Sequence, residues 1–231
     1  MRDLLVLWDV DYTLLNAAGL GNSLYETVFR DLFGRELTVI APKAGRTDRA
    51  ILLDTLTLAG VAEPRARVDD FLAALARQVA AVDGSAHAYV RALTGAAAAI
   101  AAIAATGAHQ SVLTGNIRPL AALKLAAAGL GEHLDLGIGA YGDVHEVRAE
   151  LVPVARQAAR AAYGADFGGA ATVLVGDTPL DVEAALATGA RAVGVATGSF
   201  SAADLVAAGA HVVLPDLTDT SLVLAAVTAR L

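Results

Sequence analysis

The chain has 231 residues, a net charge of −7 and no cysteine. This composition excludes disulfides and thiolate metal sites, and the acidic balance without a basic patch disfavours nucleic acid as a partner. The longest uncharged run, between Arg91 and His109, is mostly alanine, which contributes little to membrane insertion, so we expect a cytoplasmic protein without a membrane-spanning segment.

The chain opens with a short apolar stretch, Leu4–Trp8, that is typical of a buried parallel strand. Asp9 follows it directly, and Asp11 comes two residues later. Because a buried strand cannot hold two unpaired carboxylates, we expect it to end at Asp9, with Asp11 on the loop beyond. Both acids would then meet at the carboxyl edge of a sheet, where open α/β sheets bind ligands.

The next segment, residues 16–85, shows only helical patterns. We expect helices at 23–33, 47–59 and 64–82. A break at Asp83-Gly84-Ser85 then separates this segment from the rest of the chain. The sequence therefore predicts two parts, a core made of 1–15 and 86–231 and an all-helical insertion, residues 16–85.

From residue 89 onward, helical patterns alternate with short apolar stretches. We expect strands at 109–113, 134–138, 172–175, 192–195 and 211–214, with helices at 90–105, 117–128, 148–163, 180–187, 202–207 and 220–229. Such repeated βα units predict an α/β fold, with a doubly wound parallel sheet that carries helices on both faces.

A second polar strand end is Thr114-Gly115-Asn116, which opens a helix. Free backbone N–H groups and the positive end of the helix dipole favour an anion at such a position, and the hydroxyl of Thr114 adds a donor. Asn116 is a good N-cap, so an ordinary capped helix is the alternative interpretation. Alone, this motif is a weak indication of an anion site.

A third polar strand end carries Asp177, and Asp181 follows in the first turn of the next helix. An acid in that turn complements the helix dipole, which accounts for Asp181 but not for Asp177. In a doubly wound sheet, Asp9 and Asp177 would meet at one edge. Mg²⁺ suits such an oxygen-rich pocket, and without a cation the acids would raise one another's pKa.

The motifs at these strand ends resemble those of the haloacid dehalogenase superfamily. LWDVDYTLL resembles the DxDxT motif of its phosphatase members, VLTGN resembles the second motif, and GDTPLDVEAA resembles the fourth. The resemblance covers essentially the whole chain, in the right order. It implies a Rossmann-like core, residues 16–85 as a C1-type cap, and a Mg²⁺-dependent phosphatase of small phosphorylated metabolites, similar to phosphoglycolate phosphatases.

The resemblance also implies a role for each acid. Asp9 would attack phosphorus and form an aspartyl phosphate. Asp11 would protonate the leaving alcohol, for which its pKa must be raised. Mg²⁺ would be held by Asp9, by the backbone carbonyl of Asp11 and by Asp177, with Asp181 acting directly or through water. Tyr12 departs from the family pattern, in which many members carry Gly, and would restrict the loop or line the pocket.

The third motif of the family is a basic residue that neutralises the phosphate, and the chain offers two candidates. Arg148 is favoured because it precedes the fourth motif at the usual place. Lys124 lies roughly 15 Å beyond Thr114 along a helix, by the rise of a helix. The resemblance implies that Thr114, Gly115 and Asn116 bind the phosphoryl group together with one of these cations.

In the helical insertion, AGRTDRAI resembles the cap loop of phosphoglycolate-phosphatase-like members. It implies that Arg46, with Thr47 beside it, sets substrate specificity by meeting a carboxylate or a second phosphate of the substrate. The alternative is that Thr47 caps a helix while Arg46 is solvated.

Other functions remain as alternatives. A β-phosphoglucomutase-like phosphomutase would use the same two acids, whereas a haloacid dehalogenase usually lacks Asp11, because a halide needs no protonation. The stretch Gly137–Gly142 matches the GxGxxG pattern of nucleotide-dependent oxidoreductases, but no helix follows it directly. A non-catalytic scaffold would have lost at least one acid, whereas Asp9, Asp11, Asp177 and Asp181 are all present. The sequence indicates no oligomeric state.

Overall fold

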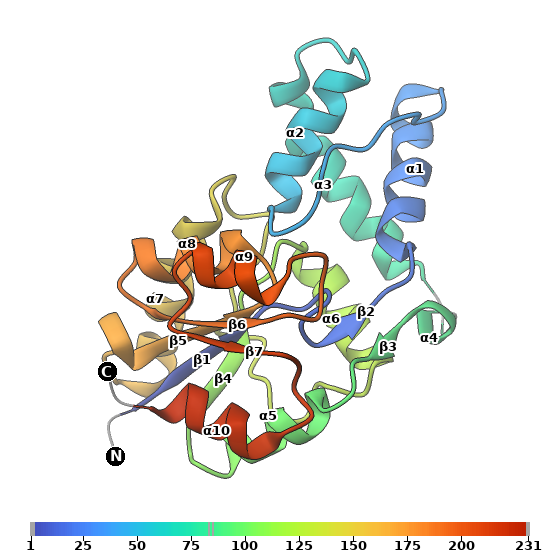
Figure 1. Cartoon of the computed structure of the whole chain (residues 1–231). Helices are drawn as coiled ribbons and strands as arrows, with labels where there is room; N and C mark the ends of the chain where they lie inside the picture. The colour runs from blue at the N-terminus through green and yellow to red at the C-terminus, as the bar shows by residue number, and fades with distance from the viewer. Residues whose placement is uncertain (1–2, 83, 85, 230–231) are drawn as a thin grey trace.

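The computed structural model describes residues 3–82, 84 and 86–229. Its main sheet has five parallel strands in the order β4-β1-β5-β6-β7 (Figure 1). These are Leu5–Trp8 (β1), His109–Val112 (β4), Thr172–Gly176 (β5), Arg191–Val195 (β6) and Val212–Leu214 (β7). β1 pairs with β4 on one side and with β5 on the other. The predicted α/β fold with a parallel sheet is confirmed.

Helices cover both faces of this sheet, because successive side chains of a strand point to opposite faces. On β1, Leu5 and Leu7 pack with α7, α8 and α9, whereas Val6 and Trp8 face the cluster that contains α5 and α10. Figure 1 shows α8 and α9 above the sheet and α10 below it. The bounds are Ala96–Ala104 (α5), Leu151–Tyr163 (α7), Pro179–Ala187 (α8), Ala202–Ala207 (α9) and Thr220–Thr228 (α10).

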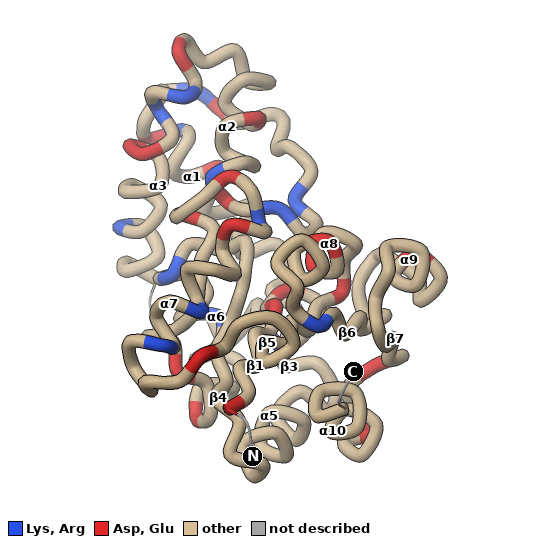
Figure 2. The backbone as a smooth tube through the Cα atoms, turned by 90° about the vertical axis from the view of Figure 1, so that its left-hand side faces the viewer, with Lys and Arg blue, Asp and Glu red and all other residues tan. Residues whose placement is uncertain are grey.

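Three helices stand apart from the sheet, beyond the carboxyl ends of its strands (Figure 1). They are Leu20–Phe33 (α1), Asp48–Leu58 (α2) and Pro64–Ala80 (α3), and they correspond to the predicted helices of the insertion. Aromatic side chains join α1 to α3: the rings of Tyr25 and Phe71 lie 5.7 Å apart. Figure 2 shows acidic and basic residues interspersed along these helices, whereas α5 carries neither. No helix in the described ranges is long and apolar enough to cross a membrane.

The connections between the three helices and the sheet are short. Leu15–Asn16 (β2) and Arg91–Ala92 (β3) pair as an antiparallel ribbon, and Ala86–Tyr89 (α4) precedes the second of them. The predicted break at residues 83–85 includes Asp83 and Ser85, which lie outside the described residues. The remaining elements are Arg118–Ala127 (α6), Arg148–Glu150 (η1) and Gly169–Ala171 (η2).

The predicted helix at 90–105 is interrupted in the structure. Arg91–Ala92 forms β3 because it pairs with β2, a contact from a distant part of the sequence. α5 then begins after Gly95, which has a φ of 88°. A Cβ atom at Gly95 would lie 2.1 Å from the carbonyl oxygen of Leu217, so only glycine allows this close approach.

The predicted strand at 134–138 is also wrong. These residues form a turn, in which Oδ1 of Asp135 accepts a hydrogen bond of 2.8 Å from the amide of Gly137. Such a hydrogen bond to a nearby side chain competes with the hydrogen bonds that the backbone would make to a neighbouring strand. At the edge of the sheet, an isolated parallel bridge pairs Leu113, the residue after β4, with Ala140. This bridge nevertheless brings the glycine-rich turn beside the strand ends.

Candidate active site

The carboxyl end of β1 presents Asp9 and Asp11, as the sequence predicted. Asp9 is buried and follows the last residue of the strand, and its amide still donates to the carbonyl oxygen of Val175 on β5 (2.8 Å). The chain then turns through Tyr12, whose φ is 61° and whose amide donates to the carbonyl oxygen of Leu15 (2.7 Å). Tyr12 therefore adopts a left-handed backbone conformation that glycine adopts without strain.

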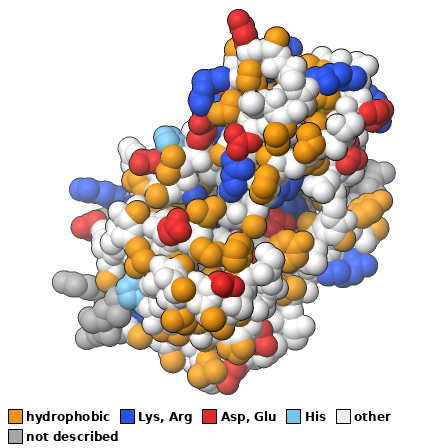
Figure 3. All heavy atoms as spheres, turned by 45° about the horizontal axis from the view of Figure 1, so that its top comes forward, with side chains coloured by type: hydrophobic (Ala, Val, Ile, Leu, Met, Phe, Trp, Pro, Cys, Tyr) orange, Lys and Arg blue, Asp and Glu red, His pale blue; other side chains and the backbone are white. Residues whose placement is uncertain are grey.

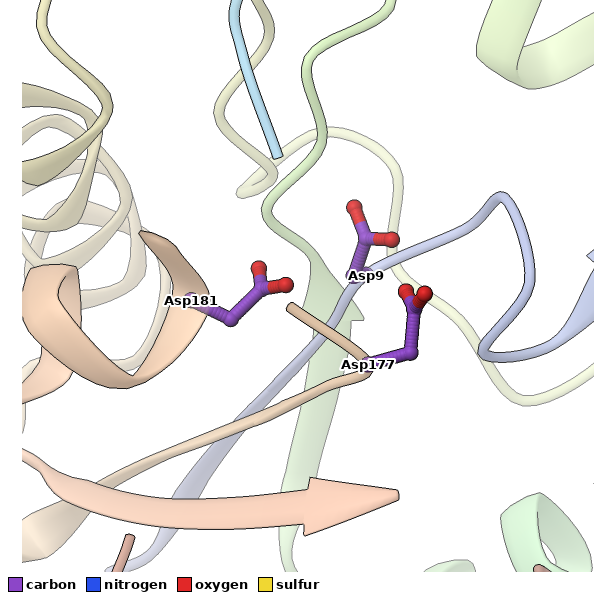
Figure 4. A group of neighbouring side chains, drawn as sticks. All are labelled: Asp9, Asp177 and Asp181. Atoms are coloured by element: carbon purple, nitrogen blue, oxygen red, sulfur yellow. The ribbon is translucent and has the colours of Figure 1, made fainter. Parts of the chain in front are cut away.

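Three buried carboxylates meet at this edge, those of Asp9, Asp177 and Asp181 (Figure 4). One oxygen atom from each lies within 4.8 Å of the others. Asp177 follows β5, and its Oδ1 accepts a hydrogen bond from the hydroxyl of Thr13 (3.1 Å). Asp181 lies in the first turn of α8, where its Oδ2 accepts from the hydroxyl (2.7 Å) and the amide (3.1 Å) of Thr178.

Arg148, at the start of η1, is the cation of this cluster. Its Nη2 lies 2.6 Å from Oδ1 of Asp9 and 2.5 Å from Oδ1 of Asp181, and it also donates to the carbonyl oxygen of Leu113 (3.0 Å). The Nε atom is buried and has no partner among the described residues. Of the two predicted third-motif candidates, Arg148 is therefore the one beside Asp9.

Lys124, on α6, contacts the other acid. Its Nζ lies 2.8 and 2.7 Å from the two carboxylate oxygens of Asp11 and 2.8 Å from Oδ1 of Asn116. The amide of the Asn116 side chain donates to Oδ2 of Asp11 (2.6 Å) and to the hydroxyl of Thr114 (2.9 Å). The prediction that Asn116 caps α6 is wrong, because Ile117 is the N-cap and has no side-chain hydrogen bond.

The first turn of α2 is docked onto this edge of the sheet. The amide of Asp48 donates to the carbonyl oxygen of Gly115 (2.7 Å), and that of Arg49 donates to Gly142 (2.9 Å). A Cβ at Gly115 would lie 2.0 Å from the carbonyl oxygen of Arg46, and one at Gly142 would lie 1.8 Å from that of Gly115. The last glycine of the GxGxxG match thus permits close packing of backbone against backbone.

Both predicted specificity residues of the insertion already have protein partners. Arg46 makes an ion pair of 2.6 Å with Asp54. Thr47 caps α2 by accepting from the amide of Ala50 (3.3 Å), and its hydroxyl donates to the carbonyl oxygen of Glu146 (3.0 Å). The capping role expected for Thr47 is confirmed. The specificity role of both residues stays a prediction.

A cavity of about 320 Å³ lies between α1, the first turn of α2 and the strand ends. Its wall includes most of the residues described above, together with Tyr12, Tyr25 and Lys43. Figure 3 shows basic and acidic side chains side by side where the three upper helices meet the rest of the molecule. A volume of this size suits a small metabolite.

The family model of haloacid dehalogenase-like hydrolases matches residues 6–186. The chain belongs to this family. The resemblance of its strand-end motifs is therefore confirmed, as is its nature as an enzyme with a hydrolase fold. No curated protein sequence matches the chain significantly.

Solved structures of this family, abbreviated HAD, share the fold. A predicted phosphatase from Clostridium acetobutylicum is 17% identical with a TM-score of 0.68, and the match covers 97% of this chain and 99% of that one. A candidate β-phosphoglucomutase from Bacteroides vulgatus is 16% identical with a TM-score of 0.66, covering 99% and 91%. A HAD family hydrolase from Deinococcus radiodurans, with bound phosphate and sodium, is 24% identical with a TM-score of 0.55, covering 97% and 94%.

The donor set of this HAD site fits Mg²⁺, which prefers a few carboxylates completed by water and phosphate oxygens. In the described part of the chain, hydrogen bonds engage only Oδ1 of Asp9 and only Oδ1 of Asp177. Both oxygens of Asp181 are engaged, by Arg148 and Thr178. Asp9 and Asp177 are therefore better placed for direct coordination, and Asp181 for coordination through water.

The electrostatics of the acidic cluster favour a cation. Burial raises the pKa of Asp9 well above its ordinary range; Arg148 opposes this shift, and Asp181 and Asp177 add to it. Burial, reinforced by Asp181, raises the pKa of Asp177 to about 7. Raised values at two adjacent acids indicate an excess of buried negative charge, which a divalent ion would neutralise.

The pKa of Asp11 is shifted in the direction opposite to the one expected. Burial would raise it, but the ammonium of Lys124 and the hydrogen bonds from Asn116 and Lys124 outweigh burial and lower the pKa. The expectation of a raised pKa is therefore wrong for the protein without substrate. The reason is a contact between Asp11 and α6 that the sequence does not reveal.

Sequence reasoning missed Asp48, Tyr25 and Lys43. The carboxylate of Asp48 is buried and accepts hydrogen bonds from the hydroxyl of Tyr25 (2.6 Å) and from the amide of Ile117 (2.8 Å). It thus joins α1 and α2 to the start of α6. In the sequence, Asp48 is an acid in the first turn of a helix, which the helix dipole alone explains.

Mg²⁺ should stabilise the protein more at pH 8 than at pH 5. The pKa of Asp177 is about 7 in the folded protein and about 4 in an unfolded chain, so the metal-free protein loses stability as the pH rises between these values. Bound Mg²⁺ would offset this loss. At pH 8, a Mg²⁺ concentration of 100 times the Kd should add about 2.7 kcal/mol, which corresponds to a rise in Tm of about 5–10 °C. The same concentration should add less at pH 5, because Asp177 is then protonated and the Kd is higher. Thermal unfolding at both pH values checks this, and an equal rise at both would contradict it.

Proposed function

We propose that this HAD hydrolase is a Mg²⁺-dependent phosphatase that hydrolyses a small phosphorylated metabolite through an aspartyl phosphate on Asp9. The arrangement around Asp9 carries the proposal. One carboxylate oxygen is fixed by Arg148, two further acids lie within reach of a shared cation, and Asp11 lies two residues away on the wall of the same cavity. Phosphoryl transfer needs this kind of positioning and charge neutralisation.

In the proposed reaction, Asp9 attacks phosphorus in line. Its Oδ1 is held by Arg148, so the orientation of the carboxylate is set before substrate arrives. Asp9, Asp177 and the backbone carbonyl of Asp11 would hold Mg²⁺, with Asp181 acting through water. When bound, Mg²⁺ would neutralise charge on the phosphoryl group and on the buried acids.

The phosphoryl oxygens would be bound by groups from three elements. The loop after β4 offers the hydroxyl of Thr114 and the backbone at Gly115 and Asn116. Arg148, whose Nη2 contacts Asp9, offers its Nε, which is buried and has no hydrogen-bond partner among the described residues. Lys124 stands beside Asp11, so it would meet the phosphoryl group from the α6 side. Together these donors face the charge that develops in the transition state.

Asp11 is proposed to move the proton. Because Lys124 and Asn116 favour its ionised form, Asp11 suits the second half of the reaction, in which it takes a proton from the hydrolytic water. Protonation of the leaving alcohol in the first half requires that the incoming phosphoryl group draws Lys124 away from Asp11. Burial would then raise the pKa of Asp11.

The helices α1–α3, within residues 16–85, are proposed to act as a cap over a core formed by 1–15 and 86–231. Residues of α1, of α2 and of the segment between them form one wall of the cavity, and the first turn of α2 is hydrogen-bonded to the loops at Gly115 and Gly142. Such a cap would exclude water from the aspartyl phosphate until the leaving group has departed. Thr47 would position the cap through its hydrogen bond to the carbonyl oxygen of Glu146, whereas the side chain of Arg46 contacts Pro42, Ala50 and Asp54 within the cap.

Hydrolysis of p-nitrophenyl phosphate tests the proposal. We expect turnover in the presence of Mg²⁺ and a loss of at least about 100-fold when EDTA removes it, since the cation contributes several kcal/mol of charge stabilisation. Activity that persists in EDTA would contradict the mechanism. A phosphomutase would use the same acids, so the products of sugar phosphates should also be identified by NMR: isomerised phosphate esters in place of inorganic phosphate would reveal a mutase.

A further inference from the structure

The cavity wall carries four cations, and three of them are paired with carboxylates. Arg148 pairs with Asp9 and Asp181, Lys124 with Asp11, and Arg46 with Asp54. The fourth is Lys43, on the segment between α1 and α2. Within the described part of the chain, no carboxylate lies at ion-pair distance from it. The charge of Lys43 is therefore the one in this wall without an acidic partner.

The surroundings of Lys43 leave room for an anion. Its Nζ donates to Oδ1 of Asn22 (2.6 Å) and lies 4.3 Å from the centre of the Tyr25 ring. An ammonium group has three donors, so further hydrogen bonds remain available. The charge of the nearby Asp48 partly compensates that of Lys43, but no ion pair joins the two among the described residues, and the carboxylate of Asp48 accepts its hydrogen bonds from the hydroxyl of Tyr25 and the amide of Ile117. Burial lowers the pKa of Lys43 and outweighs the attraction of Asp48, and the like charge of Lys124 adds to the lowering, so an anion bound here would favour the charged lysine.

The N-terminus of α1 lies beside Lys43 and adds to the positive potential. This helix has 14 residues, its N-cap is Gly19, which has no side chain to accept from the first amides, and no acid lies in its first turn. Gly19, Gly21 and Asn22 all line the cavity. A Cβ atom built at Gly21 would lie 3.7 Å from Nζ of Lys43, so the lysine head stands against the start of the helix. The partial charge of a helix N-terminus reinforces a cation at this position.

We propose that Lys43, with the start of α1, binds a second anionic group of the substrate, so that the enzyme acts on phosphate monoesters that carry a carboxylate or a second phosphate on a short chain. The proposal rests on the proposed function. The core end of the cavity holds Asp9 and Arg148 for the transferred phosphoryl group, and the cap end holds Lys43. This differs from the sequence-based assignment of the specificity role to Arg46, whose guanidinium is paired with Asp54.

The experiment compares matched substrates. One series consists of ω-carboxyalkyl phosphates with one to four methylene groups, and a second consists of alkanediol bisphosphates. The third, called neutral, consists of alkyl phosphates of equal length that lack the second anionic group. For the wild type, at least one member of a charged series should exceed its neutral counterpart in kcat/KM by about 10–100-fold, as a charge-assisted hydrogen bond predicts. The series that shows the preference identifies the second group as carboxylate or phosphate.

Three variants assign the preference to its residue. Lys43→Met should reduce the charged-to-neutral ratio of kcat/KM by at least about 10-fold, and mainly through KM. Lys43→Arg keeps the charge and should restore most of the ratio. The control, Arg67→Met, removes a cation on α3 that does not line the cavity and should leave the ratio unchanged; Arg67 pairs with Asp70 at 3.6 Å and lies 5.7 Å from the centre of the Phe33 ring. A wild type without any preference, or a Lys43→Met variant with an unchanged ratio, would overturn the proposal.

A binding measurement separates this proposal from the proposed function. Calorimetric titration with ω-carboxyalkyl phosphonates and neutral alkyl phosphonates does not depend on turnover. Tighter binding of a charged phosphonate, lost in Lys43→Met and retained in Lys43→Arg, would support the anion site even if p-nitrophenyl phosphate is not hydrolysed. Equal binding of charged and neutral phosphonates would overturn the anion site even if hydrolysis proceeds with Mg²⁺.

Discussion

Replacing Asp9 by asparagine should lower kcat by at least about 10,000-fold, as expected when a nucleophile is removed. Asparagine has nearly the same shape, so the cavity should be kept, but its amide does not form an acyl phosphate. The fold should survive because Arg148 keeps its ion pair with Asp181 at 2.5 Å. Steady-state hydrolysis of p-nitrophenyl phosphate measures the loss, and thermal unfolding verifies that the variant is folded.

Asp31→Asn is the matched control for this substitution. Asp31 is exposed on α1, so the same chemical change there should leave kcat and Tm close to those of the wild type. Because Asp9 is also a proposed metal ligand, loss of activity alone does not assign its role. Acid quenching during turnover of a ³²P-labelled substrate should trap a phosphorylated peptide that contains Asp9 and is cleaved by hydroxylamine. Label on any other residue would contradict the mechanism.

The strand ends could be predicted because their signals are local. An apolar run followed by an acid marks the point where a buried strand must end, and this reasoning placed Asp9 correctly after β1. The same logic placed Asp177 after β5. Their proximity then followed from the parallel sheet, whose strand ends share one edge. The proximity of these two acids could therefore be predicted without knowledge of side-chain packing.

The partners of Asp11 could not be predicted in the same way. Lys124 follows Asn116 by two turns of helix, yet its Nζ lies 2.8 Å from the Asn116 side chain. A long side chain on a helix leans towards the N-terminus, which shortens the separation that helix rise alone suggests. Asn116 has the residue type of an N-cap, but its amide binds Asp11. At Lys124 and at Asn116, contacts with distant parts of the chain therefore determine where the side chain binds, in place of the role that the local sequence suggests.

The contacts between the helical insertion and the core could not be predicted from the sequence either. Gly115 and Gly142 look like ordinary turn residues in the sequence, but their backbones pack against the first turn of α2. Asp48 looks like an acid that complements a helix dipole, whereas its carboxylate holds the amide of Ile117. The sequence gives no register between α2 and these loops, because the pairing is between backbone groups of segments far apart. The helices of the insertion could therefore be predicted, but their place as one wall of a cavity could not.

Replacing Arg148 by methionine should have the second large effect, on both activity and stability. The substitution leaves Asp9 and Asp181 buried without their cation, and breaking a buried ion pair in this way costs about 3–5 kcal/mol. We expect kcat/KM to fall by about 100- to 1,000-fold, because a donor to the phosphoryl group is lost at the same time. Added Mg²⁺ should recover part of the stability but not the activity, since it neutralises the acids without replacing the donor.

Lys124→Met is the comparison that decides the third-motif assignment. The side chain of its partner Asp11 is 32% exposed, compared with 9% for Asp9 and 5% for Asp181, so the unpaired acid is less strongly desolvated and the stability should change less than in Arg148→Met. Removing Lys124 also removes the main influence that lowers the pKa of Asp11, so the acidic limb of the pH–rate profile should move to higher pH. A larger loss of kcat/KM in Lys124→Met than in Arg148→Met would transfer the third-motif role to Lys124.

Arg148→Lys tests whether charge alone is sufficient. Lysine keeps the positive charge, but its compact ammonium lacks the planar fork with which arginine reaches Asp9, Asp181 and the carbonyl oxygen of Leu113 together. Stability should therefore recover more fully than kcat/KM. If both recover to the wild-type values, neutralisation of the buried acids is the whole contribution of Arg148. If kcat/KM stays low while the protein is stable, the geometry of the guanidinium orients the nucleophile.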